Sequence, residues 1–256
     1  MNKKKALQIA TRTVEVEGRL VLYKVVGEGD PIILIHGLSA SSLWWTRNVP
    51  ALAQHYRLYL VDLPGFGSMS YPRNRFALKQ AANWLLKWME AIGLQKAHFI
   101  GHSMGGYISL WIAAHHPTVV SHLVLVSPAI AARVHHVFGY LVPLLVSARH
   151  LTPSFFPILL YDALRAGPFT IIQAASDLLT VDVRQELKMV TAPTLLVWGE
   201  HDTLVPLSVG HLVCDEMQHA HFLQLKQAGH VSMYDCSETF NDAVLAFLQG
   251  EQVGEE

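Results

Sequence analysis

The chain has 256 residues, of which 51% are hydrophobic and 15% are charged, and its formal net charge is −1. This length suits one substantial α/β domain or two small ones, while the balanced charge argues against a nucleic-acid partner, which would favour a basic face. We expect a cytoplasmic protein, because cysteine is sparse and no secretory signal follows Lys3-Lys4-Lys5. Membrane association is disfavoured, because no uninterrupted apolar stretch reaches ~18 residues.

Short apolar runs alternate with helical patterns along most of the chain. Two polar–apolar runs near the N-terminus predict an antiparallel hairpin, and the continuous β-branched run Ile32–Ile35 is typical of a parallel strand buried on both faces. Strands are expected at 11–17, 20–26, 32–35, 58–61, 97–100, 122–126, 194–198 and 221–225, and helices at 42–55, 76–92, 105–115, 207–217 and 238–248. This order predicts an eight-stranded, mostly parallel sheet with helices on both faces.

The alternation is interrupted after the sixth expected strand. Residues 134–161 carry one formal charge, Arg149, among many apolar residues and several prolines. We therefore expect residues 1–127 and 191–256 to form the core and residues 128–190 to form a helical cap inserted after strand six.

Residues 99–107 hold the pattern Gly101-His102-Ser103-Met104-Gly105 between an expected strand and an expected helix. This is the arrangement of a nucleophile elbow, in which a tight turn presents the serine hydroxyl above the sheet. Alone, the pattern also fits a glycine-rich turn that only packs closely. A catalytic role for Ser103 requires a base, an orienting acid and an oxyanion hole near its hydroxyl.

In open α/β sheets, reactive groups gather beyond the carboxyl ends of the strands. Ser103, Asp202 and His230 each follow an expected strand, so they should meet at one edge. Histidine can accept the serine proton, and a carboxylate on its far ring nitrogen holds the tautomer. Glu200 is the second choice for the acid, and Asp62 is assigned to a structural turn.

The oxyanion hole should come from two backbone N–H groups. We expect one from Met104, at the helix N-terminus, and the other from the loop His36-Gly37-Leu38-Ser39, at Leu38. His36 is expected to shape this loop through backbone hydrogen bonds and His102 to pack. No metal site is expected, because no spaced Cys, Asp or Glu set accompanies the 15 histidines.

These motifs, together with Val61–Ser68, Trp198–Asp202 and Gly229-His230, resemble the α/β-hydrolase superfamily. Within it the chain resembles compact bacterial carboxylesterases, including pimeloyl-carrier-protein methyl ester esterases, which share the Asp-Leu-Pro-Gly-Phe-Gly run and a Val-Asp-x-Arg segment. Serine at the elbow departs from the aspartate of dehalogenases and epoxide hydrolases. Val231-Ser232-Met233 departs from the Trp-Ala-Gln that tends to follow the histidine in carbon–carbon bond hydrolases, which weakens that option.

The apolar cap predicts a hydrophobic substrate tunnel between cap and sheet edge, with Trp44, Trp45, Phe66 and Met104 as candidate floor and wall residues. The alternative is that these residues form only the core of the cap and its surroundings. Docking of the apolar segment Val137–Val146 on a lipid surface is a further alternative, which liposome flotation would test.

The resulting hypothesis is a cofactor-independent serine hydrolase acting on a small hydrophobic ester, as a monomer or homodimer. The same triad could instead cleave a thioester, an amide or a carbon–carbon bond. A different class is a small-molecule receptor that keeps the hydrolase fold, which a fluorophosphonate probe would distinguish from an active enzyme.

Overall fold

The computed structural model describes residues 7–69, 77–130, 143, 146–251 and 253. One eight-stranded sheet forms the centre, in the spatial order β1-β2-β4-β3-β5-β6-β7-β8. Its strands are β1 Ala10–Val16, β2 Arg19–Val26, β3 Pro31–Ile35, β4 Arg57–Val61, β5 Ala97–His102, β6 Val120–Val126, β7 Thr194–Gly199 and β8 Ala220–Leu225. The first two strands are antiparallel, as is the pairing of β2 with β4, and all later pairings are parallel. The predicted mostly parallel sheet is confirmed.

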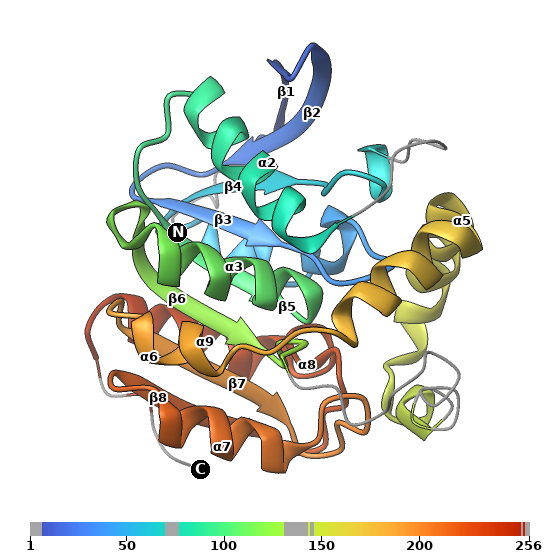
Figure 1. The fold of residues 1–256 in the computed structure, drawn as a ribbon, viewed down its shortest axis with the longest axis vertical. Helices are drawn as coiled ribbons and strands as arrows, with labels where there is room; N and C mark the ends of the chain where they lie inside the picture. Colours follow the sequence, from blue (N-terminus) through green and yellow to red (C-terminus); the bar gives the residue numbers. More distant parts are fainter. Residues whose placement is uncertain (1–6, 70–76, 131–142, 144–145, 252, 254–256) are drawn as a thin grey trace, which may run out of the picture.

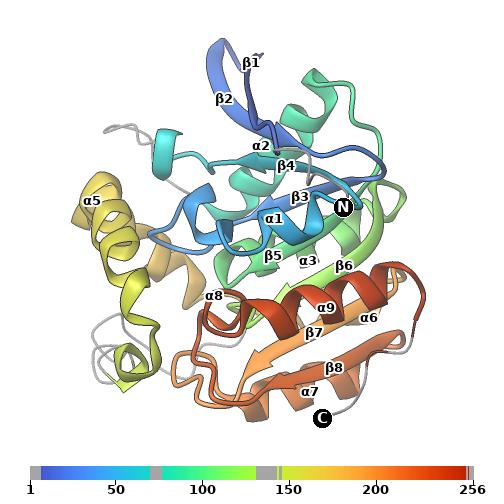
Figure 2. The same ribbon diagram turned by 180° about the vertical axis from the view of Figure 1, so that it is seen from behind.

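Helices cover both faces of the sheet. They are α1 Val49–Leu52, α2 Leu78–Ala91, α3 Met104–His115, α5 Phe156–Leu178, α6 Arg184–Met189, α7 Leu207–Glu216, α8 Ser232–Asp235 and α9 Ser237–Leu248. One face carries α2, α3, α6 and α7 (Figure 1), and the opposite face carries α1 and α9 (Figure 2). Two clusters of buried apolar side chains, one on each face, account for this layering.

The central strands are buried on both faces, which explains their continuous apolar sequence. Residues Ile32 to Ile35 of β3 have no exposed surface, and all six residues of β5 are buried. Burial of this kind contributes about 1.5–3 kcal/mol for each large apolar side chain. The sheet is therefore a rigid platform for the loops that leave its carboxyl edge.

Two glycines allow the tight passage from β5 into α3. A side chain at Gly101 would collide with the Gly105 carbonyl and the Ser109 hydroxyl, and one at Gly105 would collide with the carbonyls of Ile35 and His36. Between them, Ser103 has φ 51° and ψ −113°, a conformation that is costly for a residue other than glycine. The packed strand and helix on either side hold this strained turn in place.

The helix expected at 42–55 is broken into two pieces. A 3₁₀ turn spans Ser42–Trp45, and α1 begins again at Val49. Pro50 lies in the first turn of α1, where an N–H group would have no partner within the helix. In the interior of a helix that began at Ser42, the same proline would remove a backbone hydrogen bond.

Among the described residues of the predicted cap, 128–190, helices α5 and α6 differ in character. Helix α5 lies beyond the strand ends and changes direction at Gly167, which has φ 73° and precedes Pro168 (Figure 1). Helix α6 packs beside α3 over the sheet, and its Leu187 belongs to the main core. The sequence range of the cap therefore includes one helix of the core layer.

Candidate active site

Ser103 lies at the carboxyl edge of the sheet, at the start of α3. Its N–H donates to the Val126 carbonyl over 2.9 Å, and its carbonyl accepts from Tyr107 and Ala129. These bonds tie the turn to the neighbouring strand β6 and to the helix. Ser103 is 8% exposed, so the surrounding protein covers most of its surface.

Asp202 and His230 meet in a buried hydrogen bond. His230 Nδ1 is 2.8 Å from Asp202 Oδ2, and the other carboxylate oxygen accepts the N–H groups of Leu204 and Val205, at 2.9 Å each. Because a carboxylate oxygen accepts, the proton lies on Nδ1 and leaves Nε2 free to accept another proton. This is the arrangement expected of a catalytic base and its orienting acid.

The loops after β7 and β8 are bonded to each other, which positions this pair. Glu200 N–H donates to the Leu225 carbonyl over 3.0 Å, and His201 N–H donates to the Ala228 carbonyl over 2.9 Å. The Glu200 carboxylate instead accepts the Gln227 N–H at the exposed side of the loop. The geometry favours Asp202 over Glu200 as the partner of His230.

His102 packs behind His230, as expected from its place in the elbow. The two rings lie 4.9 Å apart, and His102 Nε2 is 3.0 Å from the His230 carbonyl oxygen. Burial, together with the neighbouring His230, lowers the pKa of His102 well below its ordinary value. A neutral ring that donates from Nε2 has an acceptor at Nδ1. His102 therefore supports the backbone of His230 through a fixed tautomer.

His36 shapes the loop that should complete the oxyanion hole. Its Nδ1 is 2.8 Å from the Gly37 carbonyl, and its Nε2 accepts the Leu63 N–H over 2.9 Å. Both ring nitrogens are thus satisfied in the neutral form, and burial lowers the pKa of His36. The structure supports the predicted structural role of this histidine.

The His36 loop closely approaches Ser103. A methyl group at Gly37 would lie 3.2 Å from Ser103 Cβ, and the following Ser39 has φ 57°. Leu38 lies between them, while Met104 begins α3, where the first N–H groups have no partner within the helix. The loop and the helix end therefore approach Ser103 together, as the predicted oxyanion hole requires.

Asp62 serves the turn to which the sequence assigned it. Its two carboxylate oxygens accept the N–H groups of Ser42 and Ser68, each over 2.7 Å. These bonds join the loop after β4 to the 3₁₀ turn after β3.

The three aromatic residues predicted to contact substrate lie in different surroundings. Trp45 is fully buried against Phe240, and Phe66 is fully buried against His36. Their packing identifies both as core residues, which corrects the expectation that they line a tunnel. Trp44 lies between His102 and Phe155, with ring centroids 5.5 and 4.8 Å away. It remains a candidate wall residue.

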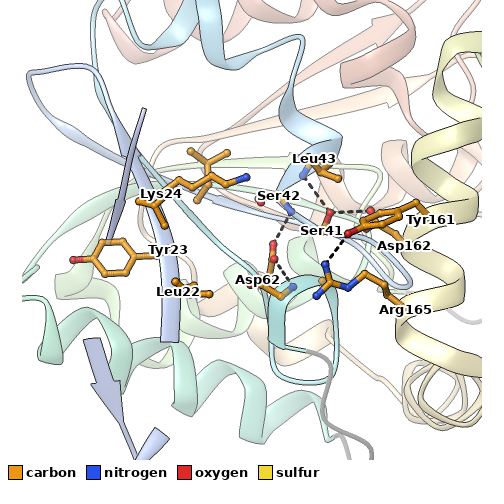
Figure 3. Close-up of a pocket in the computed structure, with 14 residues that line it drawn as sticks. Leu22, Tyr23, Lys24, Ser41, Ser42, Leu43, Asp62, Tyr161, Asp162 and Arg165 are labelled. Atoms are coloured by element: carbon orange, nitrogen blue, oxygen red, sulfur yellow. Dashed lines mark hydrogen bonds between the residues drawn. The ribbon is translucent and has the colours of Figure 1, made fainter. Parts of the chain in front are cut away.

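Sequence reasoning missed Asp162, a buried carboxylate that joins α5 to the core. Its Oδ2 accepts the Ser41 hydroxyl over 2.8 Å and the Trp44 indole N–H over 2.9 Å, while its Oδ1 has no hydrogen-bond partner. It borders a cavity of ≈ 240 Å³ with Tyr161 and Arg165 (Figure 3). The signal in the sequence is a single carboxylate in a long apolar run.

The Asp162 contact predicts a pH-dependent stability. Burial raises the pKa of Asp162 to about 6, against the opposing effect of its two hydrogen-bond donors. Since the folded protein binds this proton more tightly than the unfolded chain does, its contribution to stability falls as the pH rises through 6. We expect Asp162→Asn to gain on the order of 2 kcal/mol relative to the wild type between about pH 4.5 and pH 7.5, measured by urea unfolding.

The control for this experiment is Asp182→Asn. Asp182 is exposed, and its hydrogen bonds with Arg184 lower its pKa to about 2, below the range tested. Its stability difference from the wild type should stay constant. A difference for Asp162→Asn that also stays constant with pH would contradict the assignment.

Metal ligands do not gather at this site. Within the described part of the chain, no group of three or more His, Cys, Asp or Glu side chains is placed to hold a metal ion.

The family model described as alpha/beta hydrolase fold matches residues 30–167, more than half of the chain. The chain belongs to the α/β-hydrolase family. A second family model, described as TAP-like protein, matches residues 177–255. The two matches lie on either side of residues 168–176 and together span the sheet from β3 onward.

Curated α/β-hydrolase relatives have different names. The chain is 28% identical to a pimeloyl-[acyl-carrier protein] methyl ester esterase of Aeromonas salmonicida, over 87% of this chain and 96% of the relative. It is 30% identical to the dihydrolipoyllysine-residue acetyltransferase component of the acetoin cleaving system of Pseudomonas putida, over 94% of this chain and 70% of the relative. These names do not define one substrate for this α/β-hydrolase.

A solved structure gives the same fold. The crystal structure of a membrane phospholipase A, described as a bacterial virulence factor, matches with a TM-score of 0.81 and 27% identity, covering 94% of this chain and 86% of the other. Together with the methyl ester esterase relative, this similarity supports a hydrolase.

Proposed function

We propose that the protein is a serine hydrolase that cleaves carboxylic esters of hydrophobic substrates. The observation that carries this proposal is the 2.8 Å bond between His230 Nδ1 and Asp202 Oδ2, at the same sheet edge as the strained Ser103. A free serine hydroxyl is a weak nucleophile, so it needs a base held in one tautomer. The buried Asp202 supplies that constraint to His230.

The proposed reaction has two halves that use the same groups. Ser103 Oγ attacks the ester carbonyl carbon while His230 Nε2 accepts the hydroxyl proton. The N–H groups of Met104 and Leu38 stabilise the oxyanion, and its collapse expels the alcohol, which takes its proton from His230. Water then attacks the acyl-enzyme through His230, which releases the acid and restores Ser103. This sequence needs no metal or organic cofactor.

The preference for hydrophobic substrates is inferred from what covers the site. Thr152, in the short segment that leads into α5, donates to Asp235 Oδ1 through both its N–H and its hydroxyl, over 2.9 and 2.8 Å. Trp44 packs between the rings of His102 and Phe155, and His102 in turn lies beside His230. A methyl ester esterase among the relatives and a membrane phospholipase among the similar structures also favour an ester with an apolar part.

A panel of p-nitrophenyl esters tests this substrate class. We expect kcat/KM for the octanoate to exceed that for the acetate by at least ~10-fold, because each buried methylene contributes about 0.8 kcal/mol. The panel should include a matched octanoyl thioester and octanoyl anilide, which represent the alternative bonds. Preference for the acetate would contradict the apolar pocket, and turnover of the thioester or anilide but not the ester would replace the proposed reaction.

The remaining expectations concern the setting of the protein. A cytoplasmic location, a monomeric or homodimeric state and the absence of a nucleic-acid partner stay predictions from composition. The receptor alternative predicts binding of a small molecule without turnover, and it would require that Ser103 be unreactive.

A further inference from the structure

Helix α5 carries an unusual concentration of exposed apolar side chains. Among the described residues, six of the twelve large apolar side chains that are exposed lie on this one helix. Their exposed fractions are 44% for Phe156, 62% for Leu160, 50% for Tyr161, 74% for Leu164, 75% for Phe169 and 52% for Ile172. Tyr161 lines the cavity beside Asp162 (Figure 3), and we call the other five residues the α5 outer face. Apolar groups gathered in this way usually mark an interaction surface.

The helix is fixed to the protein by its other side. Phe155, just before the helix, and Asp162 and Ala166 within it are buried, and Asp162 holds Ser41 and Trp44 of the core. Helix α5 lies at the periphery of the molecule (Figures 1 and 2), and the side chains of the α5 outer face are exposed there. It is available to a partner without any rearrangement of the core.

The charges near the α5 outer face indicate the kind of partner. Residues 146–178 contain four charged side chains, and of the two acidic ones Asp162 is buried and Asp177 is half-buried. The other two, Arg149 and Arg165, are exposed. An anionic lipid surface would attract both arginines, whereas a second copy of the same segment would carry the same charges and offer no opposite net charge.

The helix is suited to lie on a membrane and not to cross it. The stretch Pro153–Leu178 is long and apolar enough to span a bilayer by composition, with a mean hydropathy of 1.3 in its most apolar window. However, the break at Gly167-Pro168 interrupts it, and the bonds of Asp162 hold it to the folded core. Amphipathic helices of this kind insert their apolar face at the headgroup level, in the plane of the interface.

We propose that the α5 outer face docks the protein on an anionic lipid surface, with Arg149 and Arg165 at the headgroups. This departs from the composition-based expectation that disfavoured membrane association. The apolar segment Val137–Val146, considered earlier for lipid docking, lies mostly outside the described residues and does not enter the argument. Docking would place α5, which lies beyond the carboxyl ends of the strands, against a source of apolar esters.

Vesicle co-sedimentation tests the proposal without using catalysis. Sucrose-loaded vesicles of phosphatidylcholine with phosphatidylglycerol should bind the wild type, and Ser103→Ala should bind equally, so failure of the proposed hydrolase activity would not affect the result. The double variant Leu164→Glu/Phe169→Glu should bind at least ~10-fold more weakly. Arg149→Gln/Arg165→Gln should lose most of its preference for anionic over pure phosphatidylcholine vesicles.

The matched control is Leu20→Glu/Leu212→Glu. These leucines, on β2 and α7, are 69% and 57% exposed, and the change adds the same two negative charges away from α5. Its binding should stay within ~2-fold of the wild type, while circular dichroism checks that every variant is folded. Absence of wild-type binding, or equal losses in both glutamate pairs, would overturn the proposal. Dimers that Leu164→Glu/Phe169→Glu dissociates, without vesicle binding, would assign the face to self-association instead.

Discussion

Replacing Ser103 with alanine should lower kcat/KM for p-nitrophenyl octanoate by ~10⁴–10⁶-fold, because the attacking oxygen is lost while binding and the oxyanion donors remain. The fold should survive, since the turn is held by backbone bonds from Ser103 to Val126, Tyr107 and Ala129. Steady-state kinetics and thermal unfolding of the same preparation measure both effects.

Ser127→Ala is the matched control for this prediction. Ser127 is a fully buried serine that follows β6, has φ 41°, and its hydroxyl has no hydrogen-bond partner. Ser127 shares the strand-end position and the positive φ of Ser103 but has no role in the proposed reaction. We therefore expect the activity of Ser127→Ala to stay within ~3-fold of the wild type. Activity retained by Ser103→Ala, or lost equally by both variants, would refute the assigned nucleophile.

Replacing Asp202 with asparagine should lower kcat by ~10³–10⁴-fold through the wrong histidine tautomer. The N–H groups of Leu204 and Val205 both donate to Asp202 Oδ1, so an asparagine there keeps its oxygen on these donors. Its amide NH₂ then faces His230 Nδ1 and donates to it. The imidazole proton of His230 is then held on Nε2, and this nitrogen can no longer accept the proton of Ser103.

Glu200→Gln is the comparison for Asp202→Asn, because Glu200 is the other carboxylate of the same loop. Its side chain is about 40% exposed and accepts the Gln227 N–H. The side-chain oxygen of a glutamine at position 200 can accept the same N–H. We expect kcat within ~2-fold of the wild type. If Glu200→Gln were the impaired variant and Asp202→Asn the active one, the roles of the two carboxylates would have to be exchanged.

The parts of the fold that the sequence predicted well are those with a local physical signal. Runs such as Ile32–Ile35 are apolar at every position because both faces of the strand are covered, and their ends mark the sheet edge. The partners of Ser103 could be placed by the same reasoning, since parallel strands deliver their following loops to one edge. The 2.8 Å pairing of His230 with Asp202 agrees with that placement.

The missed features depend on contacts between distant segments. Ser41 and Asp162 are 121 residues apart, and no local pattern indicates that one holds the other. Trp45 and Phe66 illustrate the same limit, because an aromatic side chain beside a catalytic loop has the same sequence signal in a core as in a pocket. The break in α5 differs from these, because Gly167-Pro168 is itself a local signal that interrupts a helix.

Labelling with a fluorophosphonate probe, followed by peptide mass spectrometry, tests the central claim most directly, because the probe reacts only with a serine that a neighbouring base activates. The wild type should be modified at Ser103, Ser103→Ala should not be modified, and Asp202→Asn should react at least ~100-fold more slowly. A folded wild type that stays unlabelled, or that is labelled at another serine, would contradict the account.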